Sequence, residues 1–224
     1  GITQELAPLA FVGGQFADFG SDQWFVEDEQ GVPQMSVGRL PFQEESQLRL
    51  YIDKLIDYEF GDRSPTFEQA RRFHFVSDNS PMNEGFSKQN TLLSENLSSS
   101  LQKAQTLHID RTLYSSDVEA KAQVFSSFDS SPLLMTYLGH AAEDRWSNNI
   151  LRTSDVSSLN NERLPIVAAL NCLNSYYFDA DPSYKGLGEE LVAHPEGGAI
   201  AFWGSTSLTH PGAQISLYQS FQSQ

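Results

Sequence analysis

The residues of this chain best suited to chemistry are one histidine and one cysteine, 32 residues apart. His140 follows the apolar run LMTYLG at 134–139, and Cys172, the only cysteine among 224 residues, follows PIVAALN at 165–171. An ordinary thiol has a pKa of about 8.5 and needs an imidazole or another positive environment to become a nucleophile at neutral pH. The two residues are therefore typical of a cysteine nucleophile and its base.

Each of the two residues comes where an apolar, strand-like run ends. In a parallel α/β sheet, reactive groups gather just beyond the carboxyl ends of adjacent strands. We therefore expect His140 and Cys172 to face one crevice, within hydrogen-bond reach or slightly beyond it. The residues alone leave a structural alternative open, because a lone cysteine is often an inert apolar residue and a histidine after a glycine often has no chemical role.

The elements that would position the two residues alternate between strands and helices. In the expected helix at 44–58, for example, Leu48, Tyr51, Ile52 and Leu55 follow helical spacing. Strands are expected at 6–13, 34–39, 72–77, 106–109, 133–139, 165–171 and 199–203, helices at 44–58, 87–105, 116–128, 186–193 and 214–224, and a long acidic loop at 16–33. This alternation predicts an α/β fold with a mostly parallel sheet and helices on both faces.

Composition and charge argue against several classes of partner. The chain has 29 acidic and 14 basic residues and a net charge of −15, so nucleic acid and anionic membranes are not expected as partners. No apolar run approaches the ~20 residues that a membrane helix requires. The charge would suit a cationic peptide, although charge that simply maintains solubility is the simpler interpretation.

The same composition gives little support for a metal or another cofactor. One cysteine forms no internal disulfide and no cysteine-rich metal site, and the five histidines lack the spacing of a zinc-binding helix. Asp179 and Asp181 lie in a loop where a structural calcium ion is an alternative to solvated carboxylates. We expect no catalytic metal and no cofactor.

Five segments match motifs of one known family, in the family's order. The segment YLGHAAEDRW at 137–146 is similar to a Tyr-x-Gly-His-Gly motif that ends in tryptophan, and the pair Asn171 and Cys172 precedes an aromatic stretch at 176–178. The other segments are MSVGRLP at 35–41, YIDKLIDYE at 51–59 and GGAIAFWGST at 197–206. Together they resemble the gingipain-type cysteine peptidases, family C25 of the caspase-like clan, over residues 9–218.

The resemblance implies a three-layer caspase-like fold and a catalytic domain over residues 1–224, within a longer multidomain protein that is secreted or exposed at the cell surface. It implies a cysteine endopeptidase that acts on a peptide or protein substrate. Cys172 would attack the scissile carbonyl, and His140 would protonate the leaving amine. The remaining catalytic roles fall, by position, on an orienting acid at Asp78 or Glu84 and on oxyanion-binding N–H groups at Gly139 and Cys172.

The resemblance also predicts a substrate pocket. Its wall would consist of Trp203, Ser205, Thr206, Ser207 and His210. Cleavage after Arg or Lys would require a carboxylate in the pocket. The stretch GFSK at 85–88 has none, and the candidate acids are Glu143 and Asp144 beside the histidine, with Glu84 as a third.

One departure from the family motif leaves a second function open. The motif reads Gly-His-Gly, whereas this chain has Ala141 after the histidine. A glycine there would permit a positive φ angle or a close approach of the substrate. The alternative is a catalytically altered caspase-like module that binds a peptide or a partner chain. A transpeptidase with a sortase-like role in surface protein secretion is a related alternative, in which an amine instead of water resolves the acyl-enzyme.

Overall fold

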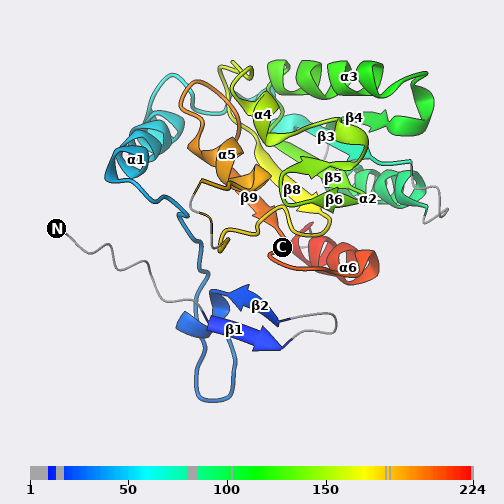
Figure 1. Cartoon of the computed structure of the whole chain (residues 1–224). Helices are drawn as coiled ribbons and strands as arrows, with labels where there is room; N and C mark the ends of the chain where they lie inside the picture. The colour runs from blue at the N-terminus through cyan, green and yellow to red at the C-terminus, as the bar shows by residue number, and fades with distance from the viewer. Residues whose placement is uncertain are drawn as a thin grey trace.

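The structure is a computed structural model that describes residues 10–13, 18–79, 85–101, 103–179, 181 and 183–222. The strands are β1 (Ala10–Gly13), β2 (Asp18–Ser21), β3 (Arg72–Ser77), β4 (Gln105–Asp110), β5 (Leu134–Leu138), β6 (Ala141–Ala142), β7 (Arg145–Trp146), β8 (Ile166–Leu170) and β9 (Ala201–Gly204). The helices are α1 (Glu45–Phe60), α2 (Phe86–Ser100), α3 (Asp117–Asp129), α4 (Thr153–Val156), α5 (Leu187–Ala193) and α6 (Pro211–Gln222) (Figure 1).

A five-stranded sheet forms the centre of the fold (Figure 1). Its strand order is β4-β3-β5-β8-β9, and every neighbouring pair is parallel. The two strands that precede the candidate catalytic residues are apolar almost throughout: β5 reads LMTYL and β8 reads IVAAL. Such continuous runs are expected where helices cover both faces of a parallel sheet.

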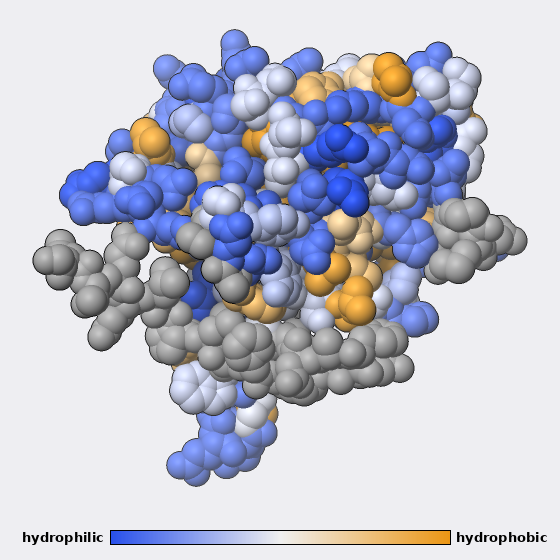
Figure 2. All heavy atoms as spheres, viewed as in Figure 1, coloured by the Kyte–Doolittle hydropathy of each residue, from blue (hydrophilic) through white to orange (hydrophobic). Residues whose placement is uncertain are grey.

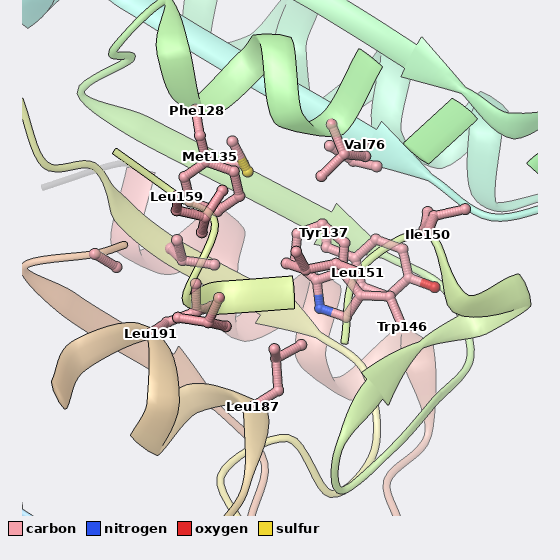
Figure 3. Packing of buried hydrophobic residues seen from close by; sticks show 14 of the residues in the cluster. Val76, Phe128, Met135, Tyr137, Trp146, Ile150, Leu151, Leu159, Leu187 and Leu191 are labelled. Carbon is pink, nitrogen blue, oxygen red and sulfur yellow. The ribbon is translucent and has the colours of Figure 1, made fainter. Parts of the chain in front are cut away.

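Helices do cover both faces of this sheet. Met135 and Tyr137 of β5 pack on one face with residues of α3, α4 and α5 (Figure 3). Leu134 and Leu138 of the same strand pack on the other face with residues of α2 and α6. Because successive side chains of a strand point to opposite faces, one short strand contributes to both apolar cores. The predicted three-layer α/β fold is confirmed.

The predicted strand at 34–39 is wrong. These residues form no strand, and those at 34–38 are exposed. Arg39 instead pairs with Asp22 and lies over the ring of Tyr177, 4.8 Å from its centre. The contacts of the Arg39 side chain therefore hold this segment in position. The few alternating apolar residues are exposed and do not pair with another strand.

Other boundaries also differ from the sequence-based expectation. The acidic loop expected at 16–33 contains β2, which pairs with β1 in an antiparallel hairpin, and a 3-10 helix at Gln23–Phe25. The helix expected at 87–105 spans Phe86–Ser100, since Leu101 has an extended backbone, and Gln105 is the first residue of β4. The helix expected at 214–224 begins earlier, at Pro211, where a proline suits the first turn. Residues 6–9, 223 and 224 lie outside the described part.

In the described part of the chain, no helix combines the length and the apolar character needed to cross a membrane.

Lys54 of α1 anchors the carboxyl end of α5. Its side chain is buried, and burial, followed by the charge of Arg63, lowers the pKa of Lys54 to about 7. The side-chain nitrogen donates to the carbonyl oxygens of Val192 (3.2 Å), His194 (2.8 Å) and Gly197 (2.9 Å). At the amino end of α5, backbone N–H groups donate to the carbonyl oxygens of Glu143, in the hairpin after His140, and of Asn174, in the turn after Cys172. The anchor at Lys54 therefore contributes to the position of the candidate site.

Replacing Lys54 with methionine is expected to destabilise the protein by about 2–4 kcal/mol, because buried carbonyl groups lose their donor. Arg49→Met on the same helix is the control: Arg49 is exposed and pairs with Glu45, so a change below about 0.5 kcal/mol is expected. Urea unfolding measures both. The pKa of Lys54 rises from about 7 to near 10.5 on unfolding, so the unfolded chain binds more protons in this window and wild-type stability should rise with pH relative to Lys54→Met. If Lys54→Met and Arg49→Met changed the free energy of unfolding equally, the hydrogen bonds of Lys54 to the three carbonyl groups would not stabilise the protein as inferred.

Candidate active site

His140 and Cys172 lie at equivalent positions beyond two adjacent parallel strands. Leu138 of β5 pairs with Leu170 of β8, and each of the two candidate residues comes two positions later. Neighbouring strands are about 4.8 Å apart, so both residues begin at the same edge of the sheet. Both are half-buried. The predicted placement at the carboxyl ends of adjacent parallel strands is confirmed, whereas the expectation that the two side chains face one crevice within hydrogen-bond reach stays a prediction.

The backbone of His140 is held on both sides. Its carbonyl oxygen accepts hydrogen bonds from the Tyr137 hydroxyl (2.7 Å) and from the Ser147 N–H (2.9 Å). Its N–H donates to Oδ2 of Asp78 at 3.3 Å. The imidazole meets the ring of Phe86 edge to face, with 5.3 Å between centres. These contacts restrict where the imidazole can lie.

Tyr137 connects this histidine to the core. Its ring stacks on Trp146, with centres 4.2 Å apart and planes 5° from parallel (Figure 3). The hydroxyl also accepts the N–H of Ser147 at 3.2 Å. Burial, followed by the charge of Asp78, raises the pKa of Tyr137 well above its usual range, so the hydroxyl remains a donor to His140. The stacked pair thereby ties the histidine turn to the buried side of β5.

Asp78 lies directly after β3 and contacts His140 through the backbone. The carboxylate is buried and accepts from the His140 N–H and from Nδ2 of Asn148, both at 3.3 Å. Asp78 also packs against Gly139: a Cβ at this glycine would come within 2.4 Å of the Asp78 Cβ. Asp78 can therefore position the histidine. Glu84, the other candidate acid, lies outside the described residues.

The thiol of Cys172 contacts Thr209, in the loop between β9 and α6. The Thr209 N–H donates to Sγ at 3.4 Å, and Sγ lies 3.6 Å from the Thr209 carbonyl oxygen and 4.0 Å from its hydroxyl oxygen. In the contact with the Thr209 carbonyl the thiol is the donor. Cys172 is free of any disulfide. Thr209 therefore fixes where the sulfur lies beyond the end of β8.

The turn after Cys172 is strained, and backbone hydrogen bonds to Ser205 and Ser207 hold it in place. Leu173 has φ +67°, a conformation that non-glycine residues rarely adopt and that tends to occur at functional sites. Its N–H donates to the Ser207 carbonyl at 3.2 Å, and the Ser175 N–H donates to the Ser205 carbonyl at 2.9 Å. The predicted wall residues Ser205 and Ser207 therefore support the cysteine turn through their backbone.

Asn174 lies in the turn after Cys172 and contacts the hairpin of β6 and β7, which follows His140. The sequence did not reveal this role. The residue is fully buried. Its Nδ2 donates to the Ala142 carbonyl at 2.5 Å, and its Oδ1 accepts from Nδ2 of Asn171 at 2.6 Å. The Gly188 N–H, at the start of α5, donates to the Asn174 carbonyl at 3.0 Å. The only sequence signal was the proximity of a second asparagine to Cys172.

Asn174→Ala is expected to destabilise the protein by about 2–4 kcal/mol, since buried partners of the amide lose their hydrogen bonds. It should also lower kcat more than it raises KM for a peptide substrate, because the turn after Cys172 and the hairpin after His140 are no longer held together by this amide. Asn160→Ala is a suitable control, since Asn160 is exposed and bonds locally to Ser158, and an effect within about 0.5 kcal/mol is expected. Urea unfolding together with steady-state kinetics measures both. A large effect on stability with unchanged kcat would contradict the coupling.

Ala141, in place of the family's glycine, adopts an ordinary backbone. It lies in β6, pairs with Trp146 of β7 and is not among the residues with positive φ. Its methyl group packs against the apolar core that contains Trp146. The backbone after His140 therefore does not need a glycine to form this hairpin.

The structure distributes the predicted pocket residues over two cavities and one helix start. Trp203 and Ser205 line a cavity of about 270 Å³ between β9 and α6. Trp203 and Thr206 line a second cavity, of about 410 Å³, which α5 and the segment 37–41 also border. His210 is exposed, and its Nδ1 accepts the Gly212 N–H at 3.2 Å, so it caps the first turn of α6.

The candidate pocket acids Glu143 and Asp144 lie in the turn between β6 and β7. The Asp144 carboxylate pairs with Arg145 at 3.2 Å, and the Glu143 carbonyl accepts the Leu187 N–H at 2.9 Å. Neither residue lines either of the two cavities. The described residues thus place these acids beside the histidine hairpin and α5.

The candidate calcium ligands Asp179 and Asp181 form local turns. Oδ1 of Asp179 accepts the Asp181 N–H at 2.8 Å, and Oδ1 of Asp181 accepts the Ser183 N–H and hydroxyl at 2.9 and 2.7 Å. The Ser183 hydroxyl and then its N–H lower the pKa of Asp181. Among the described residues, no group of three or more His, Cys, Asp or Glu side chains is placed to hold a metal ion.

Comparison with known structures supports the same fold. The crystal structure of the Arg-specific cysteine proteinase gingipain R (RgpB) is similar with a TM-score of 0.72 at 18% identity, covering 92% of this chain and 49% of that chain. The complex of the Porphyromonas gingivalis RgpB pro- and mature domains gives 0.71 at 18% identity, covering 91% and 49%. A structure described as a protease gives 0.71 at 18% identity, covering 88% and 42%.

The solved structures therefore share the fold, and this chain spans about half the length of the two gingipain chains. No curated protein matches the sequence. The family model for peptidase family C25 matches residues 3–224. The match covers nearly the whole chain, including both strand ends that carry the candidate catalytic residues, and on this basis the chain belongs to peptidase family C25.

Proposed function

We propose that this chain is the catalytic part of a cysteine endopeptidase with a dyad of Cys172 and His140. The observation that carries the proposal is the register of β5 and β8, which brings both residues to one edge of the sheet at equivalent positions. Membership of the C25 family supports a protein or peptide substrate. A secreted or cell-surface location, which the sequence resemblance to the gingipain-type peptidases implies, is part of this proposal.

In the first half of the reaction, the Cys172 thiolate attacks the carbonyl carbon of the scissile bond and a C–S bond forms. The oxygen of that carbonyl gains negative charge, which the N–H groups of Gly139 and Cys172 would stabilise. The C–N bond then breaks as the His140 imidazolium transfers its proton to the leaving amine. The product of this half is a thioester on Cys172.

In the second half, water attacks the thioester while His140 accepts its proton, and the C–S bond breaks to release the acid and regenerate the thiolate. An amine in place of water would give peptide transfer. Throughout, Asp78 would hold His140 in place by accepting its backbone N–H. A preference for Arg or Lys before the cut, the other part of the sequence prediction, would need Glu143, Asp144 or Glu84 to reach the pocket.

Alkylation of Cys172 by iodoacetamide at pH 6 tests the dyad. An ordinary thiol is almost fully protonated at this pH, whereas a thiolate beside an imidazolium remains reactive. We expect wild-type protein to be labelled at least about tenfold faster than His140→Ala, by intact mass spectrometry. Equal labelling rates, together with peptide binding but no turnover, would support the non-catalytic binding module instead.

A further inference from the structure

Helix α1 carries apolar side chains on two opposite faces. Its inner face contains the half-buried Leu48 and Leu55 and the buried Lys54. Ile56 comes two positions after Lys54, so with about 3.6 residues per turn it points to the opposite side of the helix. α1 lies at the periphery of the molecule, beside α5 (Figure 1). The outer face of α1 is therefore directed away from the sheet and the other helices.

Three exposed apolar side chains form a stripe along this outer face, here called the outer stripe. Ile52, Ile56 and Phe60 are spaced four residues apart and are 42%, 54% and 85% exposed. Side chains four apart are neighbours on a helix surface, with Cβ atoms about 5–6 Å apart, so the stripe is continuous over two turns. Figure 2 shows apolar groups exposed within a mainly hydrophilic surface in the region of α1. Single exposed apolar residues are ordinary, whereas a contiguous group is typical of an interaction site.

The carboxyl end of α1 holds Phe60 in a defined position. The Gly61 N–H donates to the Asp57 carbonyl at 2.9 Å, and the Asp62 N–H donates to Oδ1 of Asp57, also at 2.9 Å. A Cβ at Gly61 would collide with the Asp57 carboxylate, so this ending depends on the glycine. A stripe that is ordered before binding loses little conformational entropy when a partner arrives.

The charged residues beside the outer stripe are mainly acidic. Glu45, Asp53 and Glu59 are exposed on this side of α1, and Arg49, the one exposed basic residue within Glu45–Phe60, pairs with Glu45. These carboxylates favour lysine or arginine on a partner and disfavour an anionic membrane surface. A second copy of this chain would bring acidic residues against Asp53 and Glu59, so like-charge repulsion also disfavours self-association through the stripe.

We propose that the outer stripe of α1 docks an amphipathic helix of a partner protein, which carries lysine or arginine beside an apolar stripe of its own. A ridge of side chains four residues apart packs into the groove between the corresponding ridges of a second helix. An extended strand presents side chains at a period of two and matches such a ridge poorly. The basic residues of the partner meet Asp53 and Glu59. This interaction surface is independent of the proposed peptidase function.

Two synthetic peptides of identical composition provide the test. In the first, leucines form one face of a helix and lysines flank that face; in the second, the same residues are scrambled so that no face is apolar. Fluorescence anisotropy measures the binding of each peptide to the full chain. We expect wild-type protein to bind the ordered peptide at least about tenfold more tightly than the scrambled one. Because both peptides carry the same charge, this preference reports on the apolar stripe and not on attraction to an acidic protein.

Substitutions on α1 assign the binding to the outer stripe. Ile56→Ser, in the middle of the stripe, should lower the preference for the ordered peptide to about twofold or less, and Phe60→Ser should lower it as well. Leu50→Ser is the matched control, because Leu50 is 50% exposed on the same helix but lies two positions before Ile52 and so on another side; it should leave the preference unchanged. Urea unfolding checks that each variant is folded.

The double substitution Asp53→Lys and Glu59→Lys tests the charge of the partner. It should lower the preference for the ordered peptide and create one for a peptide with glutamates in place of the lysines. Equal binding of the ordered and scrambled peptides by wild-type protein, or a preference that Ile56→Ser does not alter, would overturn the proposal. A wild-type dimer in sedimentation that Ile56→Ser dissociates would assign the stripe to a second copy of this chain and would overturn it too.

Discussion

Replacing Cys172 with alanine is expected to lower kcat/KM for peptide cleavage by a factor on the order of 10⁴ or more, because the sulfur that would carry the acyl group is removed. The fold should survive. The substitution removes one half-buried sulfur atom at the end of β8, and a loss near 1 kcal/mol is expected for so small a change in volume. Fluorogenic peptide assays and thermal unfolding measure the two effects.

His140→Ala should be nearly as damaging, and the double substitution should be hardly worse than either single one, since members of a catalytic unit act together. Ser99→Ala is a suitable control, because Ser99 is exposed on α2 and bonds locally to Asn96. If wild type and Cys172→Ala cleaved the peptide at the same rate, the cleavage would not depend on Cys172. That result would contradict the proposed dyad.

Gly139→Ala is expected to have the largest effect of any single methyl group added near the site. A Cβ there would lie 2.4 Å from the Asp78 Cβ and 2.6 Å from the Tyr137 hydroxyl oxygen. Both neighbours are buried and both hold the backbone of His140, so neither can move without displacing the histidine. We expect a loss of about 2–3 kcal/mol in stability and at least a hundredfold loss in kcat.

Gly38→Ala is the matched control for this substitution. No atom lies within 4 Å of a Cβ built at Gly38 and its φ is not positive, so a change within about 0.5 kcal/mol is expected. Urea unfolding and steady-state kinetics compare the two variants. If Gly139→Ala retained wild-type stability and kcat, the close packing of Asp78 and Tyr137 around the histidine turn would not be required for the site.

The departure at Ala141 bears on how the site receives a substrate. The hairpin of β6 and β7 accommodates the alanine without a positive φ, and its methyl group packs toward the core. The loss of the glycine therefore gives no backbone reason for inactivity. The distinction between a peptidase and a binding module depends on the reactivity of Cys172, which the labelling and cleavage experiments measure directly.

The central parallel sheet, and the places of His140 and Cys172 at its edge, could be predicted from the sequence. Runs such as 134–138 and 166–170 are apolar on both faces, and such runs occur where helices cover a parallel sheet on both sides. A polar residue just after each run must then lie at the carboxyl edge of the sheet. Local composition was enough here, because burial and strand direction together specify the edge.

The residues that support and surround His140 and Cys172 became visible only in the three-dimensional contacts. Asp78 contacts a backbone N–H 62 positions away, Thr209 reaches a sulfur 37 positions away, and Gln214 reaches a carbonyl 43 positions away. No local pattern encodes such contacts, since each depends on how loops from different strands meet. The predicted strand at 34–39 failed for the same reason: its alternating pattern was local, while the contacts of Arg39 with distant side chains determined the conformation.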